Sequence, residues 1–145
     1  HRLKFVKEVS GVRFYDDSIA TTPGSAIAAL NAFSQPKILI LGGSNKGADL
    51  SELIAKISNS SENELRKVIL MGAESSKLAQ KLTQAGFERF INLGRETNMQ
   101  EVVKTSFENS QSGDVVILSP AHASFDMFKS YTDRGEQFIE NVNLL

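Results

Sequence analysis

The sequence contains no cysteine and no tryptophan, and it has only two histidines and three prolines among its 145 residues. Without cysteine, the chain forms no disulfide and offers no thiolate to a metal ion. His1 and His122 are too few to build a histidine-rich metal site. The longest apolar stretches have about five residues, far fewer than the roughly 20 that a membrane-spanning helix needs. Disulfide scaffolds, cysteine–zinc modules and membrane-spanning helices are therefore excluded from these residues.

An excess of charge of one sign is also missing. The net charge is −1, with 23% charged and 41% hydrophobic residues, which is typical of a soluble globular domain. Nothing in this balance points to nucleic acid or to an anionic membrane, so we expect neither partner. The length suits a single domain over residues 1–145. Because the chain starts at His1, directly before a predicted strand, we interpret it as a piece of a larger protein.

Apolar spacing at the start of the chain predicts a ribbon and a helix. Residues 3–9 and 12–15 alternate apolar and polar letters on either side of a Ser-Gly pair, which predicts two antiparallel strands. Pro23 after Thr22 predicts the start of a helix that ends near Phe33.

Farther along, strand and helix patterns alternate. Short apolar runs predict strands at 37–41, 68–71, 87–93 and 115–118, and helical spacing predicts helices at 50–57, 78–85, 99–107 and from 125–131 through 137–142. This order predicts an α/β domain with a Rossmann-like, mostly parallel sheet, helices on both faces, and a short antiparallel ribbon at the N-terminus. Such sheets bind ligands at the carboxyl ends of their strands, which places the loops of interest at 16–22, 42–49, 72–76, 94–97 and 119–124.

Two of these loops carry charged side chains suited to a ligand. Residues 16–22 lead into a helix N-terminus, which favours an anion, whereas Asp16 and Asp17 suit ribose hydroxyls or a cation. The residue types alone favour a plainer alternative, in which the loop only makes turns and a helix cap. Residues 42–49 place Lys46 among glycines. This favours a carboxylate or a phosphate, although the spacing of a P-loop is absent.

The loop at 119–124 offers small residues and hydroxyls after a buried strand. Ser124 suits either a helix cap or a hydrogen bond to a ligand. No GxSxG pattern accompanies His122, which argues against a Ser–His nucleophile pair and favours a packed loop residue. Arg134, farther on, suits either a solvated face or a carboxylate pair that holds this loop.

Several segments together resemble the C-terminal domain of the Mur ligases. They read HRL at 1–3, GVRFYDDS at 11–18, AT at 20–21, LILGG at 39–43, KGAD at 46–49, GDVVILSPA at 113–121, ASFDMF at 123–128 and RGEQF at 134–138. One such piece is a weak signal, whereas the ordered set is specific. Within the family the resemblance is greatest to the D-glutamate-adding type. The DNPR motif of the diaminopimelate-adding type, the DYGHHP-like loop of the L-alanine-adding type and the DGAHNP-like loop of folylpolyglutamate synthases are absent.

The resemblance implies a function for the longer protein. We expect an ATP-dependent amide-bond ligase that adds D-glutamate to UDP-N-acetylmuramoyl-L-alanine through an acyl phosphate, in peptidoglycan precursor synthesis in the bacterial cytoplasm, as a monomer. The N-terminal UDP-binding domain and the central ATPase domain, which holds most of the ATP and Mg²⁺ contacts, lie outside this chain. We therefore expect this C-terminal domain to be inactive alone. The alternatives are another Mur-type ligase and a non-enzymatic Rossmann-like module that binds an anion or a nucleotide.

The resemblance also implies roles for single residues, and it assigns no catalytic residue and no metal ligand to this domain. The residues implied to bind D-glutamate are Thr21, Lys46, Ser124 and Tyr131, and those implied to bind the nucleotide are Arg2, near the phosphates, and Asp17, at the ribose. Two positions depart from the family pattern. Ile19 stands where many members have lysine, so the ordering role of that lysine is absent or moved, and His122 stands where cysteine is common.

Overall fold

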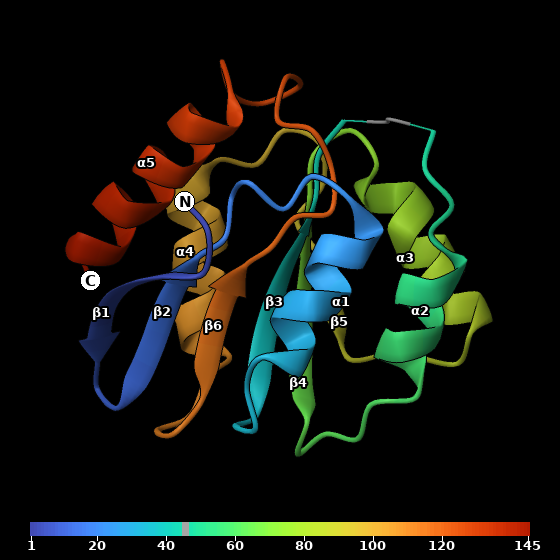
Figure 1. The fold of residues 1–145 in the computed structure, drawn as a ribbon, viewed down its shortest axis with the longest axis horizontal. Coiled ribbons are helices and arrows are strands. Elements are labelled where there is room, and N and C mark those ends of the chain that lie inside the picture. The colour runs from blue at the N-terminus through green and yellow to red at the C-terminus, as the bar shows by residue number, and fades with distance from the viewer. Residues whose placement is uncertain (45–46) are drawn as a thin grey trace.

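Six strands form one sheet in the computed structural model, which describes residues 1–44 and 47–145. Their order across the sheet is β1-β2-β6-β3-β4-β5 (Figure 1). The strands are β1 Lys4–Val9, β2 Val12–Asp16, β3 Lys37–Gly42, β4 Leu65–Met71, β5 Phe90–Asn92 and β6 Val115–Leu118. The first strand pairs antiparallel with β2, and every other neighbouring pair is parallel. The predicted ribbon and the mostly parallel sheet are both confirmed.

Helices cover both faces of the sheet (Figure 1). One face packs against α1 Pro23–Asn31, α2 Ser51–Ser58 and α3 Ser75–Gln84, and the other against α4 Met99–Glu108 and α5 Tyr131–Asn143. This arrangement confirms the predicted Rossmann-like class. Among the described residues, no helix is long and apolar enough to cross a membrane.

The central strand β3 shows why the sheet forms. All of its residues are buried, and its side chains alternate between the faces as strand geometry requires. Ile38 and Ile40 join the cluster under α4 and α5, whereas Leu39 and Leu41 join the cluster under the other three helices. Each fully buried aliphatic side chain of this kind contributes about 1.5–3 kcal/mol. The carboxyl end of β3 is therefore fixed from both sides.

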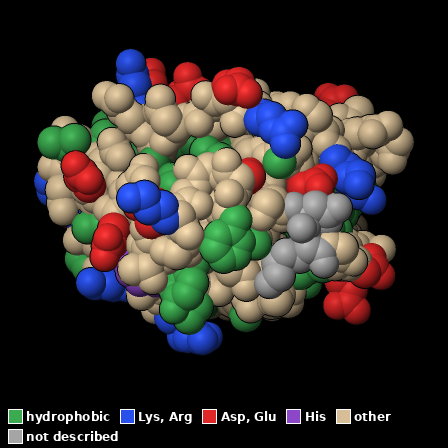
Figure 2. Space-filling model, turned by 90° about the horizontal axis from the view of Figure 1, so that it is seen from above, with side chains coloured by type: hydrophobic (Ala, Val, Ile, Leu, Met, Phe, Trp, Pro, Cys, Tyr) green, Lys and Arg blue, Asp and Glu red, His purple; other side chains and the backbone are tan. Residues whose placement is uncertain are grey.

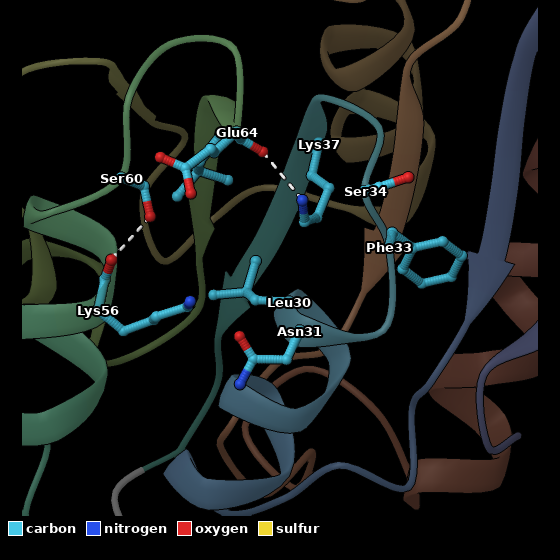
Figure 3. A pocket seen from close by; sticks show the side chains of 9 residues that line it. Leu30, Asn31, Phe33, Ser34, Lys37, Lys56, Ser60 and Glu64 are labelled. Carbon is cyan, nitrogen blue, oxygen red and sulfur yellow. Dashed lines mark hydrogen bonds between the residues drawn. The ribbon is translucent and has the colours of Figure 1, made fainter.

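A buried lysine fixes the opposite end of the same strand. Lys37 Nζ donates hydrogen bonds to the carbonyl oxygens of Gln35 at 2.9 Å and Glu64 at 3.1 Å, beside a cavity of about 180 Å³ (Figure 3). Burial lowers the pKa of the Lys37 ammonium. Both acceptors lie just before strands, Gln35 before β3 and Glu64 before β4, so Lys37 is best explained as a structural side chain that joins the starts of these two strands.

The first and last helices begin with side-chain caps. Thr22 Oγ1 accepts a hydrogen bond from the Ser25 amide at 3.3 Å, so α1 begins at Pro23 as predicted. The prediction for the last helix was wrong at its start, because α5 begins at Tyr131 and residues 125–130 form turns. The physical reason is the cap at Ser130, whose Oγ accepts from the Asp133 amide at 3.0 Å.

Candidate functional site

The carboxyl ends of β2, β6 and β3 meet at one edge of the sheet. Asp16 at the end of β2 lies opposite Leu118 of β6, and Leu118 lies opposite Ile40 of β3. The segments that follow, residues 16–22, 42–44 and 119–130, are called the carboxyl-edge loops below. Figure 1 shows them at the top of the molecule, and Figure 2 looks down on them, where hydrophobic, basic and acidic side chains all reach the surface.

Backbone hydrogen bonds join the carboxyl-edge loops to one another. The middle loop, which follows β6, bonds to both of its neighbours: Asp17 N to Leu118 O at 2.9 Å, Ala121 N to Ala20 O at 2.8 Å, Gly42 N to Pro120 O at 3.0 Å and Ser44 N to Ala123 O at 2.9 Å. These bonds satisfy polar groups that burial would otherwise leave unpaired. The loops therefore form one connected platform.

The platform depends on close backbone approach at Gly43. This residue has a φ of 148°, and a Cβ placed there would run into the carbonyl oxygen of Ala123 and the Cβ of His122. Only glycine fits such a position without a shift of the neighbouring loop. Across from it, Ala121 has a φ of 60°, an uncommon backbone for a residue with a Cβ. Strained backbone of this kind concentrates at functional sites.

The two adjacent aspartates are both buried and both have internal partners. Asp16 accepts a hydrogen bond from the Ser18 amide at 2.9 Å and contacts the His1 ring. Asp17 accepts from the amide of Leu3 at 3.1 Å and from Ser119 Oγ at 2.8 Å. Burial raises the pKa of each carboxyl group, and the hydrogen bonds oppose this rise.

These contacts support the plainer alternative, in which the aspartates have a structural role: Asp16 makes a local turn, and Asp17 joins the segments of Leu3 and Ser119. Each carboxylate oxygen can accept more than one hydrogen bond, so an added bond from a ligand to Asp17 is chemically open. Arg2 and Asp17 line one cavity of about 190 Å³ beside α1, with Ile19 in its wall. The two residues expected at the nucleotide are thus brought together.

Three of the residues expected at D-glutamate are among the described residues, and they lie on or beside the carboxyl-edge loops. Thr21 is half-buried and donates its amide to Ile19 O at 2.9 Å. Ser124 is 2% exposed, and its carbonyl accepts the amide of Phe128 at 2.8 Å. Tyr131 is 39% exposed at the first position of α5. Lys46 lies outside the described residues, so its assignment stays a prediction.

Arg134 connects α5 to two of the carboxyl-edge loops, and it is fully buried. Its guanidinium donates to Ser18 Oγ at 2.9 Å, to Ser18 O at 2.7 Å and to His122 O at 2.9 Å. Burial lowers its pKa to about 10, which leaves it charged at neutral pH. Its full burial contradicts the solvated face considered from the sequence. The expectation that Arg134 holds the loop is confirmed, but its hydrogen-bond partners are backbone carbonyl groups and a hydroxyl, where a carboxylate was expected.

Two further polar residues of the platform were missed at the sequence level. Ser119 bonds Asp17, as described above, and Asp126 Oδ2 accepts the amide of Ala73 at 2.8 Å, which joins the loop after β6 to the loop after β4. Asp126 is the single acidic residue in the small and apolar stretch ASFDMF. A single acidic residue among small and apolar ones could have indicated that Asp126 makes a tertiary hydrogen bond.

His122 belongs to the packing of its loop. It is buried, and its Nδ1 donates to the carbonyl oxygen of Pro120 at 2.9 Å. Burial lowers the pKa of the imidazole, which favours the neutral form. These contacts support the packed loop residue expected from the sequence. No cluster of three or more His, Asp or Glu side chains able to hold a metal ion occurs within residues 1–44 and 47–145.

The fold and this edge define a doubly wound α/β domain whose candidate ligand site is built by the loops after β2, β3 and β6. Residues 1–122 match the family described as "Mur ligase, glutamate ligase domain". The UDP-N-acetylmuramoylalanine--D-glutamate ligase of Caldicellulosiruptor bescii is 43% identical over 145 residues, which cover 100% of this chain and 30% of that protein. The chain belongs to the Mur ligase family, as its glutamate ligase domain.

Solved structures of the same family share the fold. A murein peptide ligase from Psychrobacter arcticus superposes with a TM-score of 0.64 at 9% identity, over 99% of this chain and 30% of that one. A MurF ligase from Thermotoga maritima, solved in complex with ADP, superposes with a TM-score of 0.54 at 17% identity, over 97% of this chain and 30% of that one. The chain spans about 30% of the length of the curated relatives it matches.

Proposed function

We propose that this chain is the C-terminal, amino-acid-binding domain of an ATP-dependent ligase that joins D-glutamate to UDP-N-acetylmuramoyl-L-alanine. The observation that carries the proposal is the 43% identity over the whole chain to a ligase named for that reaction. The carboxyl-edge loops supply a fitting site, because they gather hydroxyl groups and two aspartates at one edge.

The proposed reaction divides its work between domains. The carboxylate of UDP-N-acetylmuramoyl-L-alanine takes the terminal phosphoryl group of ATP, which leaves as ADP. The D-glutamate amine then attacks the acyl carbon of the resulting acyl phosphate, and phosphate and a proton leave. The longer protein would contribute a UDP-binding domain and a central domain for ATP and Mg²⁺, and it would act as a cytoplasmic bacterial monomer.

Within this division, the present domain positions the attacking amino acid. D-Glutamate carries two carboxylates, which need a cation and fixed donors in a partly desolvated site. Lys46 would supply the cation, Thr21 and Ser124 the hydroxyl groups, and Tyr131 one wall. Arg2 and Asp17 would meet the nucleotide phosphates and ribose as the domain closes on ATP.

The test is a kinetic comparison in the full-length enzyme. Lys46→Ala should raise the KM for D-glutamate about 10- to 150-fold, because a charge-assisted hydrogen bond is worth roughly 1.5–3 kcal/mol. The KM for ATP should change far less. Lys77→Ala, an exposed lysine on α3, is the matched control and should leave both values unchanged. Equal losses for both substrates in Lys46→Ala would mean that Lys46 is structural.

A further inference from the structure

His1 stands where three parts of the molecule meet. Its ring contacts Asp16 at the end of β2, and its carbonyl oxygen accepts the amide of Ile19 at 3.2 Å. The ring also lies edge-on to Tyr131 of α5, with centroids 6.3 Å apart and planes at 87°. A Cβ at Gly135 would collide with the imidazole, so the glycine in the first turns of α5 leaves room for this ring.

The residue pair that follows His1 is held just as closely. Leu3 donates its amide to the carboxylate of Asp17 at 3.1 Å, and it has a φ of 39°, in the left-handed region that residues with a Cβ avoid. Arg2, exposed between them, is therefore anchored on both sides. The two adjacent aspartates act as a clamp, Asp16 on His1 and Asp17 on Leu3.

The clamp joins the two halves of the proposed site. On one side it directs Arg2 to the cavity that Arg2 shares with Asp17. On the other side the His1 ring supports Tyr131, whose carbonyl oxygen accepts Ser18 Oγ at 2.6 Å. Strain at Leu3 within an otherwise regular approach to β1 shows that the surrounding contacts over-determine this backbone.

We propose that His1 is a positioning residue, which acts through its contact with Asp16 to hold Arg2 toward the nucleotide and Tyr131 toward D-glutamate. This inference rests on the proposed function, which names ATP and D-glutamate as the two ligands. It adds that the His1 side chain positions a residue for each of them. Loss of the His1–Asp16 contact should weaken the binding of ATP and of D-glutamate together. Binding of UDP-N-acetylmuramoyl-L-alanine should be unaffected, because the proposal assigns that substrate to other domains.

Two substitutions of His1 separate the effect of its contact with Asp16 from the effect of its aromatic ring against Tyr131. His1→Phe keeps an aromatic ring against Tyr131 but offers Asp16 no donor. His1→Asn keeps a donor close to the position of the imidazole Nδ1 but lacks the ring. In the full-length enzyme, His1→Phe should raise the KM for ATP and for D-glutamate each about tenfold, the loss of one charge-assisted hydrogen bond. His1→Asn should recover most of the ATP effect, and the KM for UDP-N-acetylmuramoyl-L-alanine should stay constant in both.

A merely structural role gives a different pattern. It would lower kcat in proportion to the folded fraction and leave all three KM values unchanged, and that result would overturn the inference. Equal behaviour of His1→Phe and His1→Asn would overturn it as well. Lys104→Gln, an exposed charge on α4, serves as the control with unchanged kinetics.

Amide hydrogen exchange on the 145-residue chain tests the clamp without any activity. His1→Phe should speed the exchange of the Ile19 and Leu3 amides, whereas His1→Asn should leave both protected. Unchanged exchange in His1→Phe would refute the clamp, whatever the enzyme does. If the wild-type enzyme makes no D-glutamate product while the exchange result holds, the proposed function fails and the clamp stands.

Discussion

Replacement of Arg134 by methionine tests whether the carboxyl-edge loops depend on one buried guanidinium. Methionine has a similar length and fills apolar space, but it donates no hydrogen bond. The carbonyl oxygens of Ser18 and His122, which accept from Arg134 at 2.7 and 2.9 Å, would lose their donor inside the protein. The two loops that they belong to would lose their shared attachment to α5.

The expected loss of stability follows from the two carbonyl groups that the substitution leaves without a donor. A buried carbonyl group without a donor costs about 1–3 kcal/mol, and two such groups cost about 2–6 kcal/mol. The folded state no longer has to bury a charge, which offsets part of that loss. The lowered pKa of Arg134, about 10, reflects the same burial. We therefore expect the free energy of unfolding to fall by about 3 kcal/mol, which leaves a domain of ordinary stability folded at 25 °C.

Urea denaturation at neutral pH measures this free energy, and two variants complete the series. Arg134→Lys keeps the charge but cannot span three acceptors in a planar fork, so an intermediate loss is expected. Arg95→Met removes an exposed arginine and should change the free energy by less than about 0.5 kcal/mol. A loss in Arg134→Met no larger than in Arg95→Met would refute the proposed role of Arg134.

Two further substitutions probe the same edge. Asp17→Asn keeps an acceptor for the Leu3 amide and a polar partner for Ser119, so its free energy of unfolding should stay within about 1 kcal/mol of wild type while the KM for ATP rises in the full-length enzyme. An unaltered KM would remove Asp17 from the nucleotide site. His122→Asn should reduce acid sensitivity. Burial lowers the pKa of His122, so the unfolded chain gains this proton at a higher pH than the folded chain does, and stability falls as the pH drops below about 6.5. Urea denaturation at pH 7 and 5 should show a larger loss for wild type than for His122→Asn, and equal losses would contradict the assigned cause.

The strand-and-helix order was predictable because each element carries its own local signal. The apolar run of β6 matched the structure residue for residue, and the Thr22–Pro23 pair located the start of α1. The start of α5 was misplaced because Phe125 and Phe128 mimic helical spacing. In the structure Phe125 is 75% exposed and belongs to a turn, so its apolar character does not report a buried helix face.

The site was predictable only as a set of loops. Parallel topology alone places residues 16–22 and 119–124 at one edge, and this required no knowledge of side-chain contacts. The partners of Arg134 could not be predicted, because two of them are the backbone carbonyl groups of Ser18 and His122, which leave no mark in a sequence, and the third is the hydroxyl of Ser18, 116 positions away. The contact between His1 and Asp16 could not be predicted either, because the two side chains meet only once β1 and β2 have paired.

The most direct test of the central proposal is the product of the full-length enzyme. The protein would be incubated with ATP, UDP-N-acetylmuramoyl-L-alanine and either D-glutamate, L-glutamate or meso-diaminopimelate, and the nucleotide products would be identified by mass spectrometry. The account predicts an amide product with D-glutamate, formed together with equal amounts of ADP and phosphate, and little or none with the other two amino acids. No product with D-glutamate, or a preference for meso-diaminopimelate, would contradict it.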